Sequence, residues 1–119
     1  MLDFAKKLGA HSSLTAAQIE TLHLYRRVLR GEITSKEAAG MRTPHPVKLG
    51  TYYRVLDQAM GNLHSSIWTA LVGLSLGLVR VEDLKRLIDH LPATVELDEP
   101  RQEELLAVIE AIVRSIVTQ

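Results

Sequence analysis

Residues 13–59 read SLTAAQIETLHLYRRVLRGEITSKEAAGMRTPHPVKLGTYYRVLDQA, and this stretch decides the fold. Thr15 and Gln18 have the spacing of a capping box, in which the threonine hydroxyl accepts a hydrogen bond from the third backbone amide and the glutamine reaches back to the first. Thr34 and Glu37 repeat the same spacing. Two helix starts are therefore predicted close together in the chain.

The first of these helices is expected to begin at Thr15 and to stop at Gly31, because glycine readily adopts the left-handed conformation that ends a helix. The second is expected from Ser35 to about Arg42. The sequence TPHP at 43–46 ends it, since proline disfavours helix in the residue before it. The side chains predicted to face inward from the first helix are Ile19, Leu22, Tyr25, Val28, Leu29 and Ile33.

Downstream of Gly50 the apolar residues continue at spacings of three and four, with Thr51 as the expected N-cap. Either one long helix reaches Leu78 or the helix breaks at Gly61–Asn62, and we favour the break because glycine can end one helix and asparagine can cap the next. Further helices are predicted over 81–91 and from Glu99 onward, where proline and acids suit a first turn.

No segment alternates apolar and polar residues as a half-buried strand does, so the fold class predicted is all-α. We expect a compact bundle of five to six helices that contains a helix-turn-helix. A β-wing is not expected, because no hairpin signal such as Asn-Gly lies between alternating strands.

The length of 119 residues suits a single domain with a modest core. Absence of cysteine excludes disulfides, thiolate metal sites and cysteine nucleophiles. The N-terminus has no apolar stretch of signal-peptide length, and the longest apolar run, 67–79, is shorter than the roughly 20 residues that cross a bilayer. We therefore expect a cytoplasmic protein without a membrane partner.

The formal net charge is zero, but the charges are unevenly distributed along the chain. Residues 1–57 contain nine Lys and Arg against five Asp and Glu, a balance of +4, and the remainder carries −4. Such asymmetry favours contact of the first part with a polyanion, although an ordinary mixed surface can also differ by this amount.

The stretch 13–60 resembles the helix-turn-helix of DNA-binding regulators and of serine-recombinase DNA-binding domains. The residues that carry the resemblance are Glu37, Ala38 and Ala39, followed by Thr51, Tyr53, Arg54 and Leu56. The turn TPHPVKLG departs from the pattern, because it is longer than the roughly three to four residues usual in this motif and contains two prolines.

The resemblance implies that 51–58 is a recognition helix for double-stranded DNA. Arginine can grip guanine and glutamine can grip adenine, whereas hydroxyl groups reach phosphate or thymine and lysine neutralises phosphate. The alternative is a solvated helix with ordinary surface charges. The predicted DNA-binding residues are Lys36, Arg42, Lys48, Thr51, Tyr53, Arg54 and Gln58.

Enzymatic chemistry is not expected. The five histidines lack the spacing of metal ligands, and Ser65-Ser66 beside His64 has no orienting acid. No glycine-rich phosphate loop occurs either. The sequence therefore predicts no cofactor, no metal and no catalytic residue.

The part of the chain at 62–119 is expected to fold the helical core and to pair two subunits as a homodimer. Its last helix is apolar around much of its circumference, and two glycines four residues apart would allow close helix packing. A plain monomer core is the alternative. The predicted dimerisation residues are Trp68, Gly73, Gly77, Ile109, Ile112 and Ile116.

The function predicted is that of a transcription regulator or nucleoid-associated protein. The alternative function, from another class of protein, is that of a helical protein-interaction adaptor or a regulatory subunit of a replication or partition complex. Either would use the apolar C-terminal helices to bind a protein.

Overall fold

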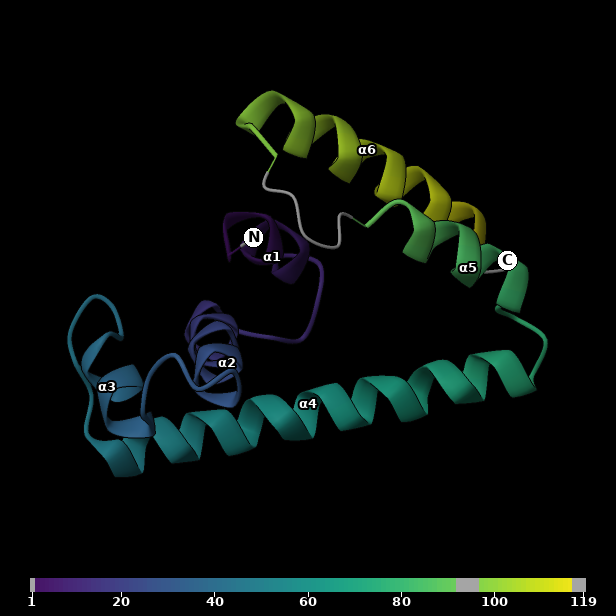
Figure 1. The fold of residues 1–119 in the computed structure, drawn as a ribbon. Coiled ribbons are helices and arrows are strands. Elements are labelled where there is room, and N and C mark those ends of the chain that lie inside the picture. The colour runs from purple at the N-terminus through teal and green to yellow at the C-terminus, as the bar shows by residue number, and fades with distance from the viewer. Residues whose placement is uncertain (1, 92–96, 117–119) are drawn as a thin grey trace. The chain divides into compact units, whose positions relative to one another are not determined.

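Helices are the regular elements in the computed structural model, which describes residues 2–91 and 97–116 (Figure 1). Within these ranges there are six helices and no strand, so the all-α prediction is confirmed. Their bounds are α1 Leu2–Gly9, α2 Ala16–Leu29, α3 Ser35–Gly40, α4 Leu49–Ser75, α5 Val81–Asp89 and α6 Glu99–Ile116.

The chain divides into two compact units after His64. The first, residues 2–64, holds α1 to α3 and the N-terminal part of α4. The second begins at Ser65 with the rest of α4 and includes α5 and α6, which pack against each other. No Asp, Glu, Lys or Arg lies between Asp57 and the boundary, so the first unit carries the whole +4 balance.

Both predicted capping boxes are confirmed. At the start of α2 the Gln18 amide donates to the Thr15 hydroxyl at 3.1 Å, and the Thr15 amide donates to the Gln18 side chain at 3.0 Å. Thr34 and Glu37 make the same reciprocal pair, at 3.1 Å in both directions, at the start of α3. Local sequence therefore sets where each helix begins.

Gly31 adopts a φ of 74° after α2, as predicted, and the chain turns there into α3. The core of the first unit forms where α2 and α3 lie beside the N-terminal half of α4 (Figure 1). Its buried residues are Leu24, Ala38, Ala39, Tyr52 and Leu56.

One inward-facing residue of α2 was wrongly predicted. Leu29 is 67% exposed, whereas Leu24, which was not in the predicted set, is 4% exposed. Leu29 is the last residue of α2, so no following turn of helix covers it. Ile19 is buried as predicted.

Helix α1 was not predicted from the sequence. Its Phe4 is buried, and its last residue, Gly9, lies so close to α2 that an added Cβ would clash with the Cδ1 atom of Ile19. Packing against α2, rather than a cap signal in the sequence, accounts for this helix.

Helix α4 differs from its prediction at two places. It begins at Leu49, two residues before the expected N-cap Thr51, and it runs without a break through Gly61–Asn62. Gly61 does not take a positive φ, and the Asn62 side chain donates to the Gln18 side chain of α2 at 3.1 Å instead of capping a new helix. This tertiary hydrogen bond favours continuity over a second start.

Helices α5 and α6 lie where they were predicted, with α5 ending at Asp89. Gly77 has a φ of 73° in the turn after α4, a conformation that favours glycine. None of the described helices combines the length and apolar character needed to span a membrane.

Candidate nucleic-acid interface

A buried ion pair holds the turn that precedes α4. The Arg42 guanidinium donates through Nε to Glu20 Oε1 at 2.7 Å and through Nη1 to the Thr21 hydroxyl at 2.8 Å. The Thr43 amide donates to the same Glu20 oxygen at 2.8 Å, and the Thr43 hydroxyl donates to Glu20 Oε2. The carboxylate of α2 therefore fixes the first residues of the turn.

Burial alone would raise the pKa of Glu20 by penalising its charge, but hydrogen bonds from Thr43 and Arg42 and the attraction of the guanidinium outweigh it, so the pKa of Glu20 is lowered. The carboxylate is thus held in its charged form. At the far end of the turn the Val47 amide donates to the Ala39 carbonyl at 3.0 Å. The long double-proline turn is tied to α2 at one end and to α3 at the other.

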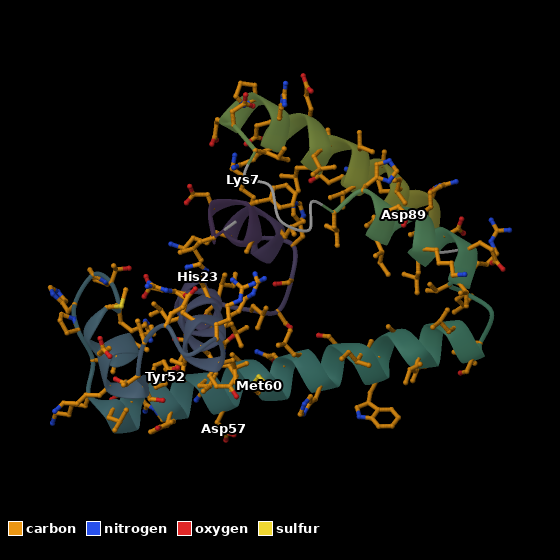
Figure 2. All side chains as sticks on the ribbon, in the orientation of Figure 1. Lys7, His23, Tyr52, Asp57, Met60 and Asp89 are labelled. Carbon is orange, nitrogen blue, oxygen red and sulfur yellow. The ribbon has the colours of Figure 1, made fainter. Side chains whose placement is uncertain are left out.

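The first turns of α4 separate into an inner and an outer side. Tyr52, Leu56 and Ala59 are buried, as predicted, whereas Arg54 and Gln58 are exposed. Figure 2 shows Tyr52 on the side of α4 toward α2 and α3 and Asp57 on another side. These buried residues anchor one side of α4 in the core. The opposite side of the helix therefore faces solvent while the helix itself is held in place.

The predicted recognition residues fall into two groups. Thr51, Arg54 and Gln58 are spaced i, i+3 and i+7, so they share one face of α4, with Thr51 half-buried. Tyr53 is exposed on a neighbouring face, where its ring meets that of Tyr52 edge-on with centroids 5.5 Å apart. Arg54 and Gln58 therefore share one face of the helix, and Tyr53 lies on the next.

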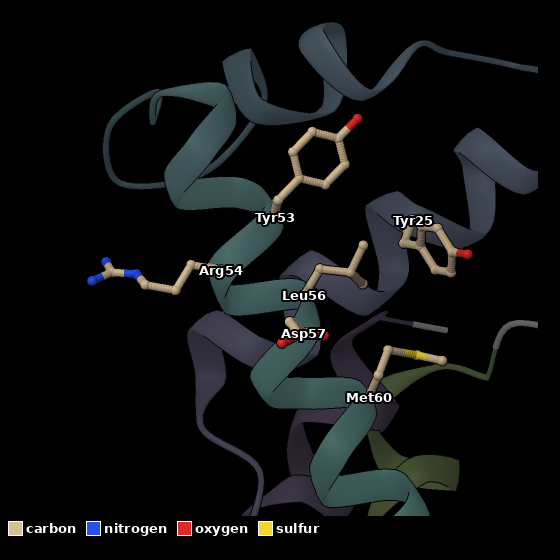
Figure 3. A pocket seen from close by; sticks show the side chains of 6 residues that line it. All are labelled: Tyr25, Tyr53, Arg54, Leu56, Asp57 and Met60. Atoms are coloured by element: carbon tan, nitrogen blue, oxygen red, sulfur yellow. The ribbon is translucent and has the colours of Figure 1, made fainter.

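A groove of about 470 Å³ lies along α2 and α4, beside these residues. Figure 3 shows Tyr53, Tyr25 and Met60 around it, with the Arg54 side chain extending from α4 away from Tyr25. The residues that line the groove are Tyr25, Tyr53, Arg54, Leu56, Asp57 and Met60. Arg54 therefore stands at its edge and projects into solvent.

Lys36 and Lys48 are exposed, on α3 and immediately before α4. Arg42 is different, because it is only 7% exposed and its guanidinium is engaged by Glu20 and Thr21. It cannot reach a phosphate without breaking this pair. We therefore correct its assignment from a DNA contact to an internal support of the turn.

The predicted dimerisation residues differ in how exposed they are in the structure. Ile109, Ile112 and Ile116 are buried within the single chain, so they are not free to meet a partner. Gly73 is half-buried, and a Cβ there would stand 3.0 Å from Cγ2 of Val79, which explains the glycine by packing within the chain. Trp68, in contrast, is 70% exposed.

Glu20 and Thr21 are the residues that sequence reasoning missed. Both lie within α2, where polar residues are ordinarily solvated, and Arg42 is 22 positions from Glu20 and 21 from Thr21. Local spacing in α2 therefore gave no signal for this pair. No group of three His, Asp or Glu residues that could hold a metal ion occurs among the residues that the structure describes.

The comparisons with known proteins give no family for the chain: no family model, no curated protein and no solved structure matches it.

Proposed function

We propose that this chain binds double-stranded DNA, with the N-terminal half of α4 in the major groove and a role in transcription regulation or nucleoid organisation. The observation that carries the proposal is the exposed pair Arg54 and Gln58 on one face of a helix whose opposite face is anchored in the core. Side chains on a supported helix can be held against base edges with little loss of conformational entropy.

The electrostatic balance of the first unit supports the same function. Residues 2–64 carry a net charge of +4, and two lysines are exposed near the turn, Lys36 on α3 and Lys48 immediately before α4. Lysines in these positions would neutralise phosphates on either side of the groove occupied by α4. The turn between α3 and α4, held by Glu20 of α2, would fix the angle between these two helices.

A protein-interaction adaptor is the second candidate, because the C-terminal half of α4 exposes several large apolar side chains. Such an adaptor would have no affinity for DNA at low salt. The two functions are therefore separable by a direct binding measurement.

Arg54→Ala tests the proposed reading face. Wild-type protein is used to enrich a preferred duplex from a randomised pool, and affinity is then measured by fluorescence anisotropy. We expect the variant to lose about 1–3 kcal/mol on the enriched duplex, the usual worth of a bidentate contact to a base, and to change little on a scrambled duplex.

The matched control is Arg114→Ala, which removes an exposed arginine from α6 in the other unit. It should leave both affinities unchanged. An unaltered affinity of Arg54→Ala for the enriched duplex, or an equal loss in the control, would remove Arg54 from the reading face.

A further inference from the structure

The groove between α2 and α4 has a mainly aromatic and apolar lining. Tyr53, Asp57 and Met60 follow one another at i, i+4 and i+7, so they form one wall along α4. Tyr25 of α2 lies across from them, and Leu56 lies on the side of α4 toward it (Figure 3). The volume of about 470 Å³ is within the range of roughly 300–1,000 Å³ that is usual for small-ligand sites.

The three tyrosines of the chain all lie at or beside this groove. Tyr25 and Tyr53 line it, and the fully buried Tyr52 meets the ring of Tyr53 edge-on. Burial raises the pKa of Tyr52, and its neighbours Tyr53 and Tyr25 raise it further, which places the three phenols close together. Tyr53 is about half exposed and is supported by Tyr52, so its ring offers a surface on which a planar ligand can stack.

The charged groups at the groove restrict the kind of ligand that fits it. The Arg54 side chain extends away from Tyr25, so Asp57 is the charged group left among the described residues that form the wall. A carboxylate accepts hydrogen bonds and repels a phosphate. The surrounding unit nevertheless carries +4, which attracts a polyanion. A fitting ligand therefore brings N–H donors into the groove and keeps its negative charges outside, on the side of Arg54.

We propose that the groove binds an unpaired base, guanine by preference, of a DNA strand whose phosphates stay outside near Arg54. Any base can stack on an aromatic ring such as that of Tyr53. Guanine also presents two neighbouring donors, its ring N1–H and its exocyclic amino group, to the two oxygens of a carboxylate, whereas thymine presents a single N–H. An acidic peptide or a free phosphate would instead bring negative charge against Asp57.

The inference rests on the proposed function, because the basic first unit is what holds the phosphates of the strand. Taking a paired base out of a duplex costs pairing and stacking energy, and a base that is already unpaired avoids this cost. A duplex with a single bulged guanine therefore presents the ligand directly. We expect it to bind more tightly than the same duplex without the bulge.

Fluorescence anisotropy of the full chain with three duplexes of one sequence tests the inference: fully paired, with a bulged guanine, and with a bulged thymine. The bulged guanine should bind about 5- to 150-fold more tightly than the bulged thymine, the usual discrimination of a bidentate base contact. Asp57→Asn should lose this preference. Tyr53→Leu should weaken both bulged complexes by about 5- to 150-fold, as for loss of one stacked base, and Tyr53→Phe, which keeps a ring, should not.

Asp3→Asn is the matched control, because it removes the same charge from an exposed position of α1 and should keep the preference for guanine. Circular dichroism should show native helix content in each variant.

The outcomes separate this inference from the proposed function. If the fully paired duplex binds but the two bulged duplexes bind equally well, the inference is overturned and the proposed function stands. A preference for guanine that persists in Asp57→Asn also overturns it. If only the duplex with the bulged guanine binds, the inference stands and the proposed function fails. If none of the three duplexes binds, both are overturned.

Discussion

Replacement of Arg42 by alanine is expected to lower the free energy of unfolding of the first unit by about 3–5 kcal/mol. The change leaves Glu20 buried with a charge that no cation balances, and it removes the donor to the Thr21 hydroxyl. A buried charge without its partner is costly because the surrounding protein solvates it poorly. Urea denaturation followed by circular dichroism measures the loss.

Arg27→Ala is the control for this experiment, since Arg27 also donates through Nε to a glutamate, Glu32, at 3.2 Å. Both side chains of that pair are substantially exposed, so the pair contributes no more than about 1 kcal/mol. Equal losses in the two variants would show that Arg42 is not an internal support and would reopen its assignment as a surface cation.

Leu24→Ala is expected to lower the free energy of unfolding by about 2–5 kcal/mol. Leu24 is 4% exposed and packs in the cluster with Ala38, Ala39 and Tyr52, so truncation removes buried apolar surface and leaves a cavity between α2 and α4. Thermal and urea unfolding should both report the loss.

Leu29→Ala provides the matched comparison, because it makes the same truncation on the same helix at an exposed position. We expect a change within about 0.5 kcal/mol. If the two truncations cost the same, the described packing of α2 against α4 is incorrect, and with it the side that α4 turns toward solvent.

The helix starts of α2 and α3 could be predicted because their determinants are local. Thr15 with Gln18, and Thr34 with Glu37, each satisfy backbone amides within one turn, so no distant residue is needed. Gly31 ends α2 for an equally local reason. The all-α class could be predicted because apolar residues recur at spacings of three and four along the whole chain.

The continuity of α4 could not be predicted in this way. Gly61 and Asn62 carry a local signal for a helix end, and a tertiary hydrogen bond from Asn62 to Gln18 overrides it. The inward side of α2 was also predicted incorrectly at one position. Leu29 is the last residue of the helix and is exposed, whereas Leu24, within the helix, is buried.

The candidate site was partly accessible from sequence. The face of Thr51, Arg54 and Gln58 follows from helical spacing once α4 is placed, and the burial of Tyr52 and Leu56 follows with it. The role of Arg42 could not be predicted from this spacing, because basic residues in a turn are ordinarily exposed. Its partner Glu20 comes from another helix, and pairing across 22 positions leaves no trace in local spacing.

The central claim, that the first unit binds DNA through phosphate and base contacts, is tested most directly by titrating a random-sequence duplex at two salt concentrations. Each phosphate contact contributes about −0.9 to the slope of log affinity against log salt, so three contacts weaken binding roughly 40-fold between about 50 and 200 mM. We expect a decrease of at least this size. No binding at the lower salt, or an affinity that does not change with salt, would contradict the account.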